Sequence, residues 1–382
     1  MHERLALKLL RQLMSWDEET ATREYRWIRL VSRMKYDGYR DYLAGVRFAE
    51  SLAGWLTQFA AADRPVAYAF IKNRLVYFSP PEIQRLVEQL YPRFVAPRLR
   101  QMVSSESGTP EYLVWGKAAS ERRYRQLQRQ TMFVGLSDGA RLDQFRRANA
   151  GMLVNEQVVL ATHIDDEKWS DLAAKLRKSA LFSDAAETPL FRSVYLVDDF
   201  TGSGTSFLRK NKRGVWDGKA VRFWKNVSHA RANLTKQGDY LPLSEDFSVH
   251  VHHYVSSMQA HNEISGQMAA VAADQPADWY HAYEVSEGLL LPAAIKLSPE
   301  TDPDIWRLAD SYYDGGLNEE MKEALEAAQQ TEIKFGYGNS ALPLVLEHNC
   351  PNNALTLLWA ETNGTAGPAM QPSWSYPTLG CR

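Results

Sequence analysis

An apolar run that ends abruptly in two adjacent carboxylates occupies residues 194–207. Residues 194–197 are β-prone and apolar without alternation, which is typical of a strand covered on both faces in a mostly parallel sheet. Asp198 and Asp199 follow, and a small glycine-containing turn precedes Leu208, where a helix is expected to start. The stretch therefore predicts a buried strand that leads into a phosphate-cradling loop.

The acids and the turn have the chemistry of an anion site. Open α/β sheets bind ligands at the carboxyl ends of their strands, which is where Asp198 and Asp199 would lie. Successive strand side chains point to opposite faces, so one carboxylate is expected to enter the crevice while the other braces it or reaches the rim. Glycine permits backbone angles that let successive N–H groups converge on an anion. The small and hydroxyl-bearing residues of the turn are Gly202, Ser203, Gly204, Thr205 and Ser206.

This stretch resembles the phosphoribosyl pyrophosphate (PRPP) motif of type I phosphoribosyltransferases, in which four apolar, two acidic and two apolar residues precede a Thr/Gly-rich turn. The resemblance implies that Asp198 and Asp199 bind the ribose hydroxyls, directly or through Mg²⁺, and that residues 202–206 hold the 5′-phosphate. Gly202 departs from the pattern, because a Thr is usual there. Two other interpretations stay open: a Walker B strand, although no GxxxxGK[ST] loop precedes it, and a plain strand whose carboxylates cap the next helix.

A second apolar run, upstream, also ends in a polar turn, Gly-Leu-Ser-Asp-Gly-Ala-Arg. Type I phosphoribosyltransferases carry a pyrophosphate-binding loop after an early strand, and this turn resembles it. The resemblance implies that Arg141 neutralises the leaving pyrophosphate, with Ser137 and the Gly139 backbone as hydrogen-bond donors. It also implies that Asp138 takes a proton from the acceptor. The alternative is a structural ion pair of Arg141 with Asp138 or Asp143.

Composition bounds the class of protein. The 382 residues suffice for one large domain or two ordinary ones. A net charge of −2 and a pI near 6.5 argue against wholesale coating of nucleic acid or anionic membrane, although they allow a local basic face. Cys350 and Cys381 form no CxxC pair, and no signal peptide or apolar run of transmembrane length is present. The sequence therefore predicts a cytoplasmic protein with no membrane partner.

The chain is expected to have three parts. Residues 1–104 are mainly helical by periodicity and form either a winged-helix module or a helical lid or dimerisation segment. After a linker at residues 104–111, alternating strands and helices over residues 112–363 predict an α/β fold, a phosphoribosyltransferase-like, mostly parallel sheet flanked by helices. Residues 364–382, rich in Pro, Gly and Trp, are expected to lie extended on the surface.

Three local patterns add detail. A β-like segment at residues 75–78 precedes Ser79, which is expected to cap a helix that starts at Pro80. Residues 261–331 are expected to be helical. A strong strand at residues 247–255 carries three histidines, of which two face one way and one the other. No Cys or carboxylate completes a ligand set at useful spacing, so solvated strand histidines are favoured over a metal site.

Three segments together resemble the phosphoribosyltransferase-like effectors of bacterial conflict systems, some of which accompany retron reverse transcriptases. They are the Gly-Leu-Ser-Asp-Gly-Ala-Arg turn, the Asp-Asp-Phe-Thr-Gly-Ser-Gly-Thr motif and the Pro-Asn-Asn...Leu-Leu-Trp ending. The resemblance implies a toxin effector of antiphage defence that partners keep silent. The implied partners are a retron reverse transcriptase with its DNA and a separate winged-helix protein.

The resemblances imply an enzyme that binds PRPP, or a nucleotide of similar shape, with Mg²⁺. It would transfer phosphoribose to a nucleobase or other acceptor, or cleave it from one. No dedicated nucleophile is needed, because the acceptor nitrogen or water attacks carbon 1 of the ribose. Preorganised carboxylates and Arg141 would stabilise the opposite charges that grow as pyrophosphate departs. The alternative is a non-catalytic sensor of the same fold that binds PRPP or a nucleotide and changes its protein contacts.

Overall fold

The structure, a computed structural model, describes residues 3–36, 47–183, 188–274 and 281–372. Its contacts group the chain into two compact units. One unit combines Met1–Ile83 with Pro292–Arg382, and the other is Gln84–Leu291. These units differ from the three parts expected from the sequence, because residues 84–104 group with the sheet and residues 292–363 group with the N-terminal helices.

A five-stranded sheet forms the centre of the Gln84–Leu291 unit, with the order β3-β2-β4-β7-β8. Every neighbouring pair in this sheet is parallel. The strands are β2 (Thr131–Gly135), β3 (Val158–Leu160), β4 (Phe191–Thr201), β7 (Leu243–Ser257) and β8 (Ala282–Leu291). The inner strands β2 and β4 are buried along most of their length, which explains their unbroken apolar runs. The predicted α/β fold with a mostly parallel sheet flanked by helices is confirmed.

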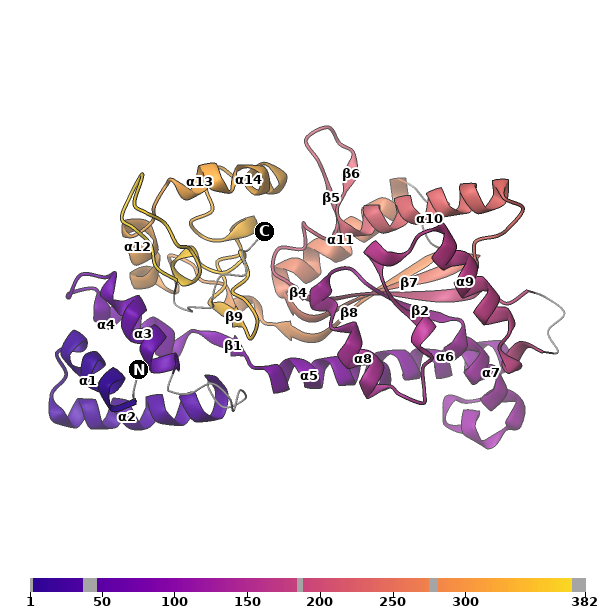
Figure 1. Ribbon diagram of the computed structural model, residues 1–382, viewed down its shortest axis with the longest axis horizontal. Helices are drawn as coiled ribbons and strands as arrows, with labels where there is room; N and C mark the ends of the chain where they lie inside the picture. Colours follow the sequence, from indigo (N-terminus) through magenta and orange to yellow (C-terminus); the bar gives the residue numbers. More distant parts are fainter. Residues whose placement is uncertain (1–2, 37–46, 184–187, 275–280, 373–382) are drawn as a thin grey trace. The chain divides into compact units, whose positions relative to one another are not determined.

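Helices cover both faces of this sheet (Figure 1). On one face, alternate strand residues such as Leu196 and Val251 share a core with three helices. These helices are α9 (Asp166–Arg177), α10 (Lys219–Lys236) and α11 (Met258–Asp274). Their apolar faces exclude water from the strands, so the ends of the strands are held in fixed positions.

The opposite face of the sheet is lined by aromatic rings. The ring of Phe133 stands 4.8 Å from that of Phe145 on α8 (Leu142–Ala148). The ring of Tyr195 stacks on His250 at 4.4 Å. Two further helices of this unit are α6 (Ala96–Ser107) and α7 (Ala118–Arg129). Side chains of successive strand residues thus divide between two covered faces, as strand geometry requires.

Two elements of this unit differ from the sequence prediction. No helix starts at Leu208; the chain forms a hairpin of β5 (Arg209–Lys210) and β6 (Trp216–Asp217), and α10 begins only after it. Residues 261–331 are not all helical, because β8 lies within them and pairs with β7. The charged residues of β8 resemble those of a surface helix, so its tertiary pairing overrides its local preference.

The three histidines of β7 are buried, so the prediction of solvated histidines is wrong. His250, His252 and His253 expose 3%, 0% and 2% of their surfaces. The Nδ1 atom of His252 lies 2.9 Å from the Ser286 hydroxyl, and that of His250 lies 3.3 Å from the Glu284 carboxylate. Among the residues that the structure describes, no group of three or more His, Cys, Asp or Glu side chains could hold a metal ion.

The other unit is mainly helical, as predicted for its N-terminal half. Its helices are α1 (Glu3–Met14), α2 (Glu18–Val31), α3 (Arg47–Thr57), α4 (Arg64–Asn73), α12 (Pro303–Ser311), α13 (Leu317–Glu320) and α14 (Lys322–Ala328), and α5 (Pro80–Gln89) lies where the two units meet along the chain. No helix within the described ranges is both long enough and apolar enough to cross a bilayer. The helix expected at Pro80 is confirmed: both the N–H and the hydroxyl of Ser79 donate to Glu82, at 2.8 and 2.6 Å.

The predicted strand at residues 75–78 is β1 (Val76–Phe78), and its partner is β9 (Leu344–Leu346) from the C-terminal part of the chain. A winged-helix module pairs its strands locally, so this pairing does not support that alternative. The C-terminal segment is also fixed to this unit: the Asp314 carboxylate accepts backbone N–H groups of residues 364–366, and Met370 is buried. Residues 364–372 are therefore anchored to this unit at these points, although most of them are exposed, whereas 373–382 lie outside the described part.

Burial of the histidines predicts a pH dependence of stability. Burial lowers the pKa of His252 from 6.5 to about 3. As the pH falls, the unfolded chain therefore binds a proton at this histidine at a higher pH than the folded chain does. The free energy of unfolding then decreases between about pH 6.5 and pH 3. In urea unfolding at a series of pH values, we expect His252→Gln to make this loss shallower by about 1.4 kcal/mol per pH unit. The exposed His281 gives the control: His281→Gln should keep the wild-type slope, and an unchanged slope in His252→Gln would contradict the prediction.

Candidate functional site

The two predicted turns leave neighbouring strands at the same edge of the sheet. β2 and β4 pair in parallel up to Gly135 and Val197, and the Leu136 N–H donates to the Val197 carbonyl at 2.9 Å. Because this pairing stops at the same level, the polar residues that follow emerge together at the carboxyl edge, where α/β sheets bind ligands. The tertiary structure thus brings together two motifs that are far apart in the sequence.

Asp198 lies inside this edge, with 2% of its surface exposed. Its carboxylate accepts the Ser137 hydroxyl and forms an ion pair with the Lys219 ammonium. Burial raises the pKa of the Asp198 carboxyl; the positive charge of Lys219 opposes that rise, and the charge of Asp199 adds to it. Lys219 is the first residue of α10, so this one carboxylate joins β4 to the turn after β2 and to the start of a helix.

Asp199 has different surroundings, because strand side chains alternate between the two faces. It is half-buried, and its carboxylate lies against the backbone of Gly139: a Cβ atom at residue 139 would stand 2.5 Å from Oδ2 of Asp199. Only glycine permits this approach. The sequence predicted that one acid enters the crevice while the other braces it or reaches the rim. Asp198, with its two internal partners, has the surroundings of a bracing acid.

The turn after β4 is shaped by Gly204, whose φ is +80°. A Cβ there would stand 3.0 Å from the carbonyl of Ala260 on α11. The Ser257 hydroxyl donates to the Gly202 carbonyl at 2.5 Å. Within the described ranges, the hydrogen bonds of this turn leave the backbone N–H groups of residues 203–206 without a protein partner. Consecutive N–H groups of this kind are the donors of an anion-binding turn.

The turn is open to solvent only toward its end. Ser203 exposes 3% of its surface, and its hydroxyl lies 2.9 Å from that of Thr205. Thr205 is half-buried and Ser206 is exposed. An anion on this turn would therefore be reached from the side of Thr205 and Ser206, while Ser203 supports the turn from within.

Asp138 and Arg141 of the other turn line a cavity of about 630 Å³ that also contacts α8, β3 and α9. The other charged or ionisable residues along it are Asp143, Arg146, His163 and Lys168. The carboxylate of Asp143 lies 3.2 Å from the guanidinium of Arg146. Asp198, Asp199 and the turn after β4 do not line this cavity.

Sequence reasoning missed two residues that hold the edge together. Lys219 is the first residue of α10, and a cation there opposes the helix dipole unless an acid pairs with it. That unfavourable placement was the one available signal for a buried partner. Tyr254 of β7 donates its hydroxyl to the Ala140 carbonyl at 3.1 Å and so holds the turn after β2 from a third strand. Its place in an apolar strand gave no such signal.

The ion pair of Asp198 predicts a pH-dependent defect. Lys219→Met leaves a buried carboxylate without its counter-ion, and we expect it to lower the free energy of unfolding at neutral pH by about 3 kcal/mol. The loss should shrink as the pH is lowered, because protonation of Asp198 removes the uncompensated charge. Urea unfolding at mildly acidic and mildly basic pH measures both effects.

A double variant provides the control for that measurement. Lys219→Met with Asp198→Asn removes both charges and should recover most of the lost stability. A cost that is the same at every pH, or that the second substitution does not reduce, would contradict a buried ion pair.

Comparison with known proteins identifies the family but no individual relative. A family model described as PRTase-CE matches residues 52–375, which is most of the chain. Neither a search of curated proteins nor a search of solved structures gave a match. The match includes both turns at the carboxyl edge and extends into both compact units. The chain therefore belongs to the phosphoribosyltransferase-like PRTase-CE family.

Proposed function

We propose that the carboxyl edge of β2 and β4 binds PRPP, or a nucleotide of similar shape, and transfers its phosphoribose to a nucleobase or other acceptor. One observation carries this conclusion: the acid pair lies between an anion-binding turn on its own strand and the turn that follows the adjacent strand. A ribose 5-phosphate with a leaving group at carbon 1 needs this combination, a phosphate cradle at one end and a second polar turn at the other.

The turn of residues 203–206 offers its N–H groups to the 5′-phosphate, with the hydroxyls of Thr205 and Ser206 beside them. Asp199 contacts the ribose hydroxyls, because it is the acid that faces outward to the other turn. Asp198 is a positioning residue. Its contacts with Lys219 and Ser137 fix the end of β4, and this fixes the direction in which the Asp199 side chain points. The two acids then have one contacting role and one bracing role.

The turn after β2 serves the leaving group. As the bond from carbon 1 to pyrophosphate breaks, positive charge grows on the ribose and negative charge on the pyrophosphate. Asp199 stabilises the positive charge of the ribose, and Arg141 stabilises the negative charge of the pyrophosphate. The acceptor nitrogen forms the new bond to carbon 1 and gives its proton to Asp138. Ser137 and the Gly139 backbone position this turn, the former through its bond to Asp198.

The oxygen atoms at this edge of the sheet are suitable ligands for Mg²⁺. Mg²⁺ takes oxygen ligands and is commonly held by one or two carboxylates together with substrate phosphates. The described residues contain no cluster of three possible protein ligands, so Asp199 would hold the ion with oxygens of the substrate. When bound, the ion would neutralise charge on the pyrophosphate.

A second candidate function is a sensor that binds PRPP or a nucleotide without turnover. The engagement of Asp198 by Lys219 favours it, because that carboxylate is occupied inside the protein. In either case, the resemblance of three sequence segments to bacterial conflict effectors supports a role in antiphage defence. A retron reverse transcriptase with its DNA and a winged-helix protein are then the partners to test.

Pyrophosphate release tests the proposal directly. The protein is incubated with PRPP and Mg²⁺, with and without nucleobases, and followed by ³¹P NMR. We expect pyrophosphate from the wild type and at least about a hundredfold less from Asp199→Asn, because one preorganised charge is lost. Glu245→Gln removes an exposed carboxylate of the same unit and should change nothing. Saturable binding without pyrophosphate would establish the sensor instead, and the absence of both would overturn the site.

The contact between the two turns gives a second test. Gly139→Ala places a methyl group 2.5 Å from the Asp199 carboxylate and must displace it. We expect PRPP affinity, measured by calorimetry, to fall at least about tenfold while the fold survives. Gly266→Ala is the matched control, because nothing lies within 4 Å of a Cβ at that helical residue, and it should bind as the wild type does. Equal affinity in Gly139→Ala would contradict a ribose contact by Asp199.

A further inference from the structure

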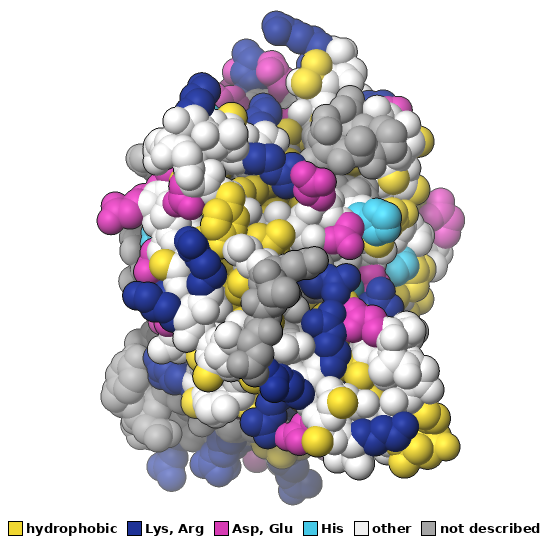
Figure 2. All heavy atoms as spheres, turned by 90° about the vertical axis from the view of Figure 1, so that its right-hand side faces the viewer, with side chains coloured by type: hydrophobic (Ala, Val, Ile, Leu, Met, Phe, Trp, Pro, Cys, Tyr) yellow, Lys and Arg dark blue, Asp and Glu magenta, His cyan; other side chains and the backbone are white. Residues whose placement is uncertain are grey.

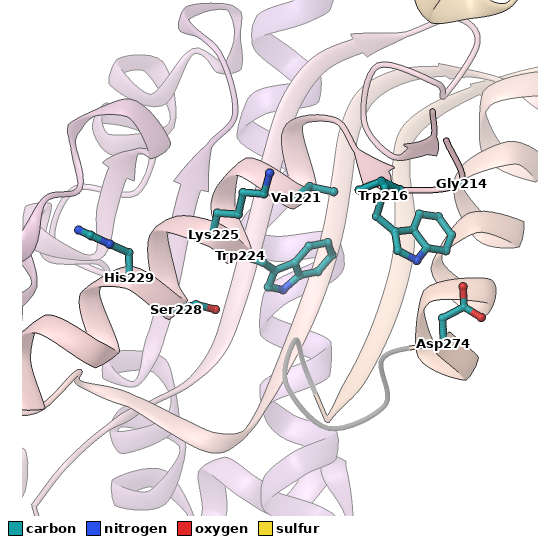
Figure 3. Close-up of a pocket in the computed structure, with 9 residues that line it drawn as sticks. Gly214, Trp216, Val221, Trp224, Lys225, Ser228, His229 and Asp274 are labelled. Atoms are coloured by element: carbon teal, nitrogen blue, oxygen red, sulfur yellow. The ribbon is translucent and has the colours of Figure 1, made fainter. Parts of the chain in front are cut away.

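Two conspicuous features of the structure do not indicate a ligand. Figure 2 shows acidic and basic side chains interspersed over one face of the molecule, so charge alone does not mark a docking surface there. The cavity in Figure 3, of about 890 Å³, lies between the β5–β6 hairpin, α10 and the end of α11. Its two indoles, Trp216 and Trp224, belong to the core, and its lining includes both a cation, Lys225, and an acid, Asp274.

A smaller cavity of about 330 Å³ lies on the aromatic face of the sheet, against η2 (Leu90–Val95) and the start of α6. Its deepest lining residues, which form its floor, are Tyr195 of β4 and His250 of β7, each only 3% exposed. Arg93 and Phe94 line it from η2, a π-helical turn, and such turns are rare and frequent at functional sites. This volume is at the lower end for small-molecule sites.

The Tyr195 hydroxyl is an unsatisfied polar group at this floor. Both nitrogens of His250 are engaged: Nε2 lies 3.2 Å from the Ser248 hydroxyl, and Nδ1 lies 3.3 Å from the Glu284 carboxylate. The Tyr195 ring stacks between Phe133 and His250, but its hydroxyl has no hydrogen-bond partner among the described residues. Burial raises the pKa of Tyr195, so the hydroxyl keeps its proton and can donate it to a ligand in a hydrogen bond. A buried polar group of this kind is unfavourable until a ligand or water satisfies it.

Two charges of opposite sign lie at the exposed mouth of the cavity. Arg93 and Glu111 are both exposed lining residues, and neither forms an ion pair within the described ranges. Arg93 donates to the Gly288 carbonyl at 3.3 Å, which leaves other N–H groups of its guanidinium available. The remaining charged lining residues, Arg98 and Glu284, lie 4.0 Å apart and compensate each other.

We propose that this cavity binds a small zwitterion, namely a free amino acid with a polar side chain. Its carboxylate pairs with Arg93, its ammonium pairs with Glu111, and its side chain reaches the Tyr195 hydroxyl. A purely anionic ligand would face Glu111 with like charge, and a purely cationic one would face Arg93 with like charge. An apolar molecule would leave all three groups unsatisfied. The site shares no residue with the proposed PRPP site.

Calorimetry with the full chain and each proteinogenic L-amino acid, without PRPP, tests the class of ligand. We expect saturable binding of at least one amino acid with a polar side chain. Its N-acetyl derivative lacks the ammonium and its α-amide lacks the carboxylate, so each should bind at least about tenfold more weakly. Absence of binding by every amino acid, binding of apolar ones alone, or equal binding of either derivative would overturn the proposal.

Charge-removing variants test the mouth of the cavity. Arg93→Gln and Glu111→Gln should each lower the affinity for that amino acid at least about tenfold, because each removes a charge-assisted contact. Arg147→Gln and Glu245→Gln remove exposed charges of the same signs elsewhere in this unit and should bind as the wild type does. An equal loss in the controls, or unchanged affinity in both test variants, would contradict the assigned contacts.

Tyr195→Phe tests the floor with two readouts. The variant should bind the amino acid at least about threefold more weakly, since one neutral hydrogen bond is lost. Without ligand, its urea unfolding midpoint should not fall, because the hydroxyl has no partner in the described part of the protein. Tyr124→Phe is the matched control: its hydroxyl lies 3.1 Å from that of Tyr91, so the midpoint should fall. A lower midpoint with unchanged affinity in Tyr195→Phe would overturn the contact.

Discussion

A buried carboxylate holds the carboxyl edge of the sheet together. Asp198 accepts a hydroxyl from the turn after β2 and an ammonium from the first residue of α10, so three separate segments meet at one side chain. Taking a charged group out of water is unfavourable, and the ion pair with Lys219 offsets that cost only while the geometry is kept. The positions of Asp199 and of the turn after β4 depend on this node, because both follow directly from the end of the same strand.

Strand geometry then gives the two adjacent acids different surroundings. Because neighbouring side chains of β4 point to opposite faces, Asp198 is braced within the protein while Asp199 approaches the Gly139 backbone. Gly204 lets the turn fold against the start of α11, where a side chain would collide with Ala260. The proposed phosphate site thus depends on a close approach between two backbone segments, and the proposed ribose contact on the approach of a carboxylate to a glycine.

Short sequence patterns predicted the elements that depend on residues close to one another in the sequence. The apolar run of β4 predicted a strand covered on both faces, Ser79 and Pro80 predicted the start of α5, and the glycines predicted the turn after β4. The location of the candidate site was predictable to the same extent, because Asp198, Asp199 and the polar residues of both turns stand at the ends of recognisable strands. The hairpin and β8 were not, since a two-residue strand has no periodicity and β8 forms through its pairing with β7.

The sequence by itself determined that two polar turns end two buried parallel strands, because hydrophobic pattern and glycine chemistry are local properties. Only the tertiary structure decided that β2 and β4 are adjacent, that Lys219 reaches back to Asp198, and that the histidines of β7 are covered. It also decided that the C-terminal segment packs with the N-terminal helices in one unit. These outcomes depend on which distant segments bury each other's surfaces, and no window of neighbouring residues contains that information.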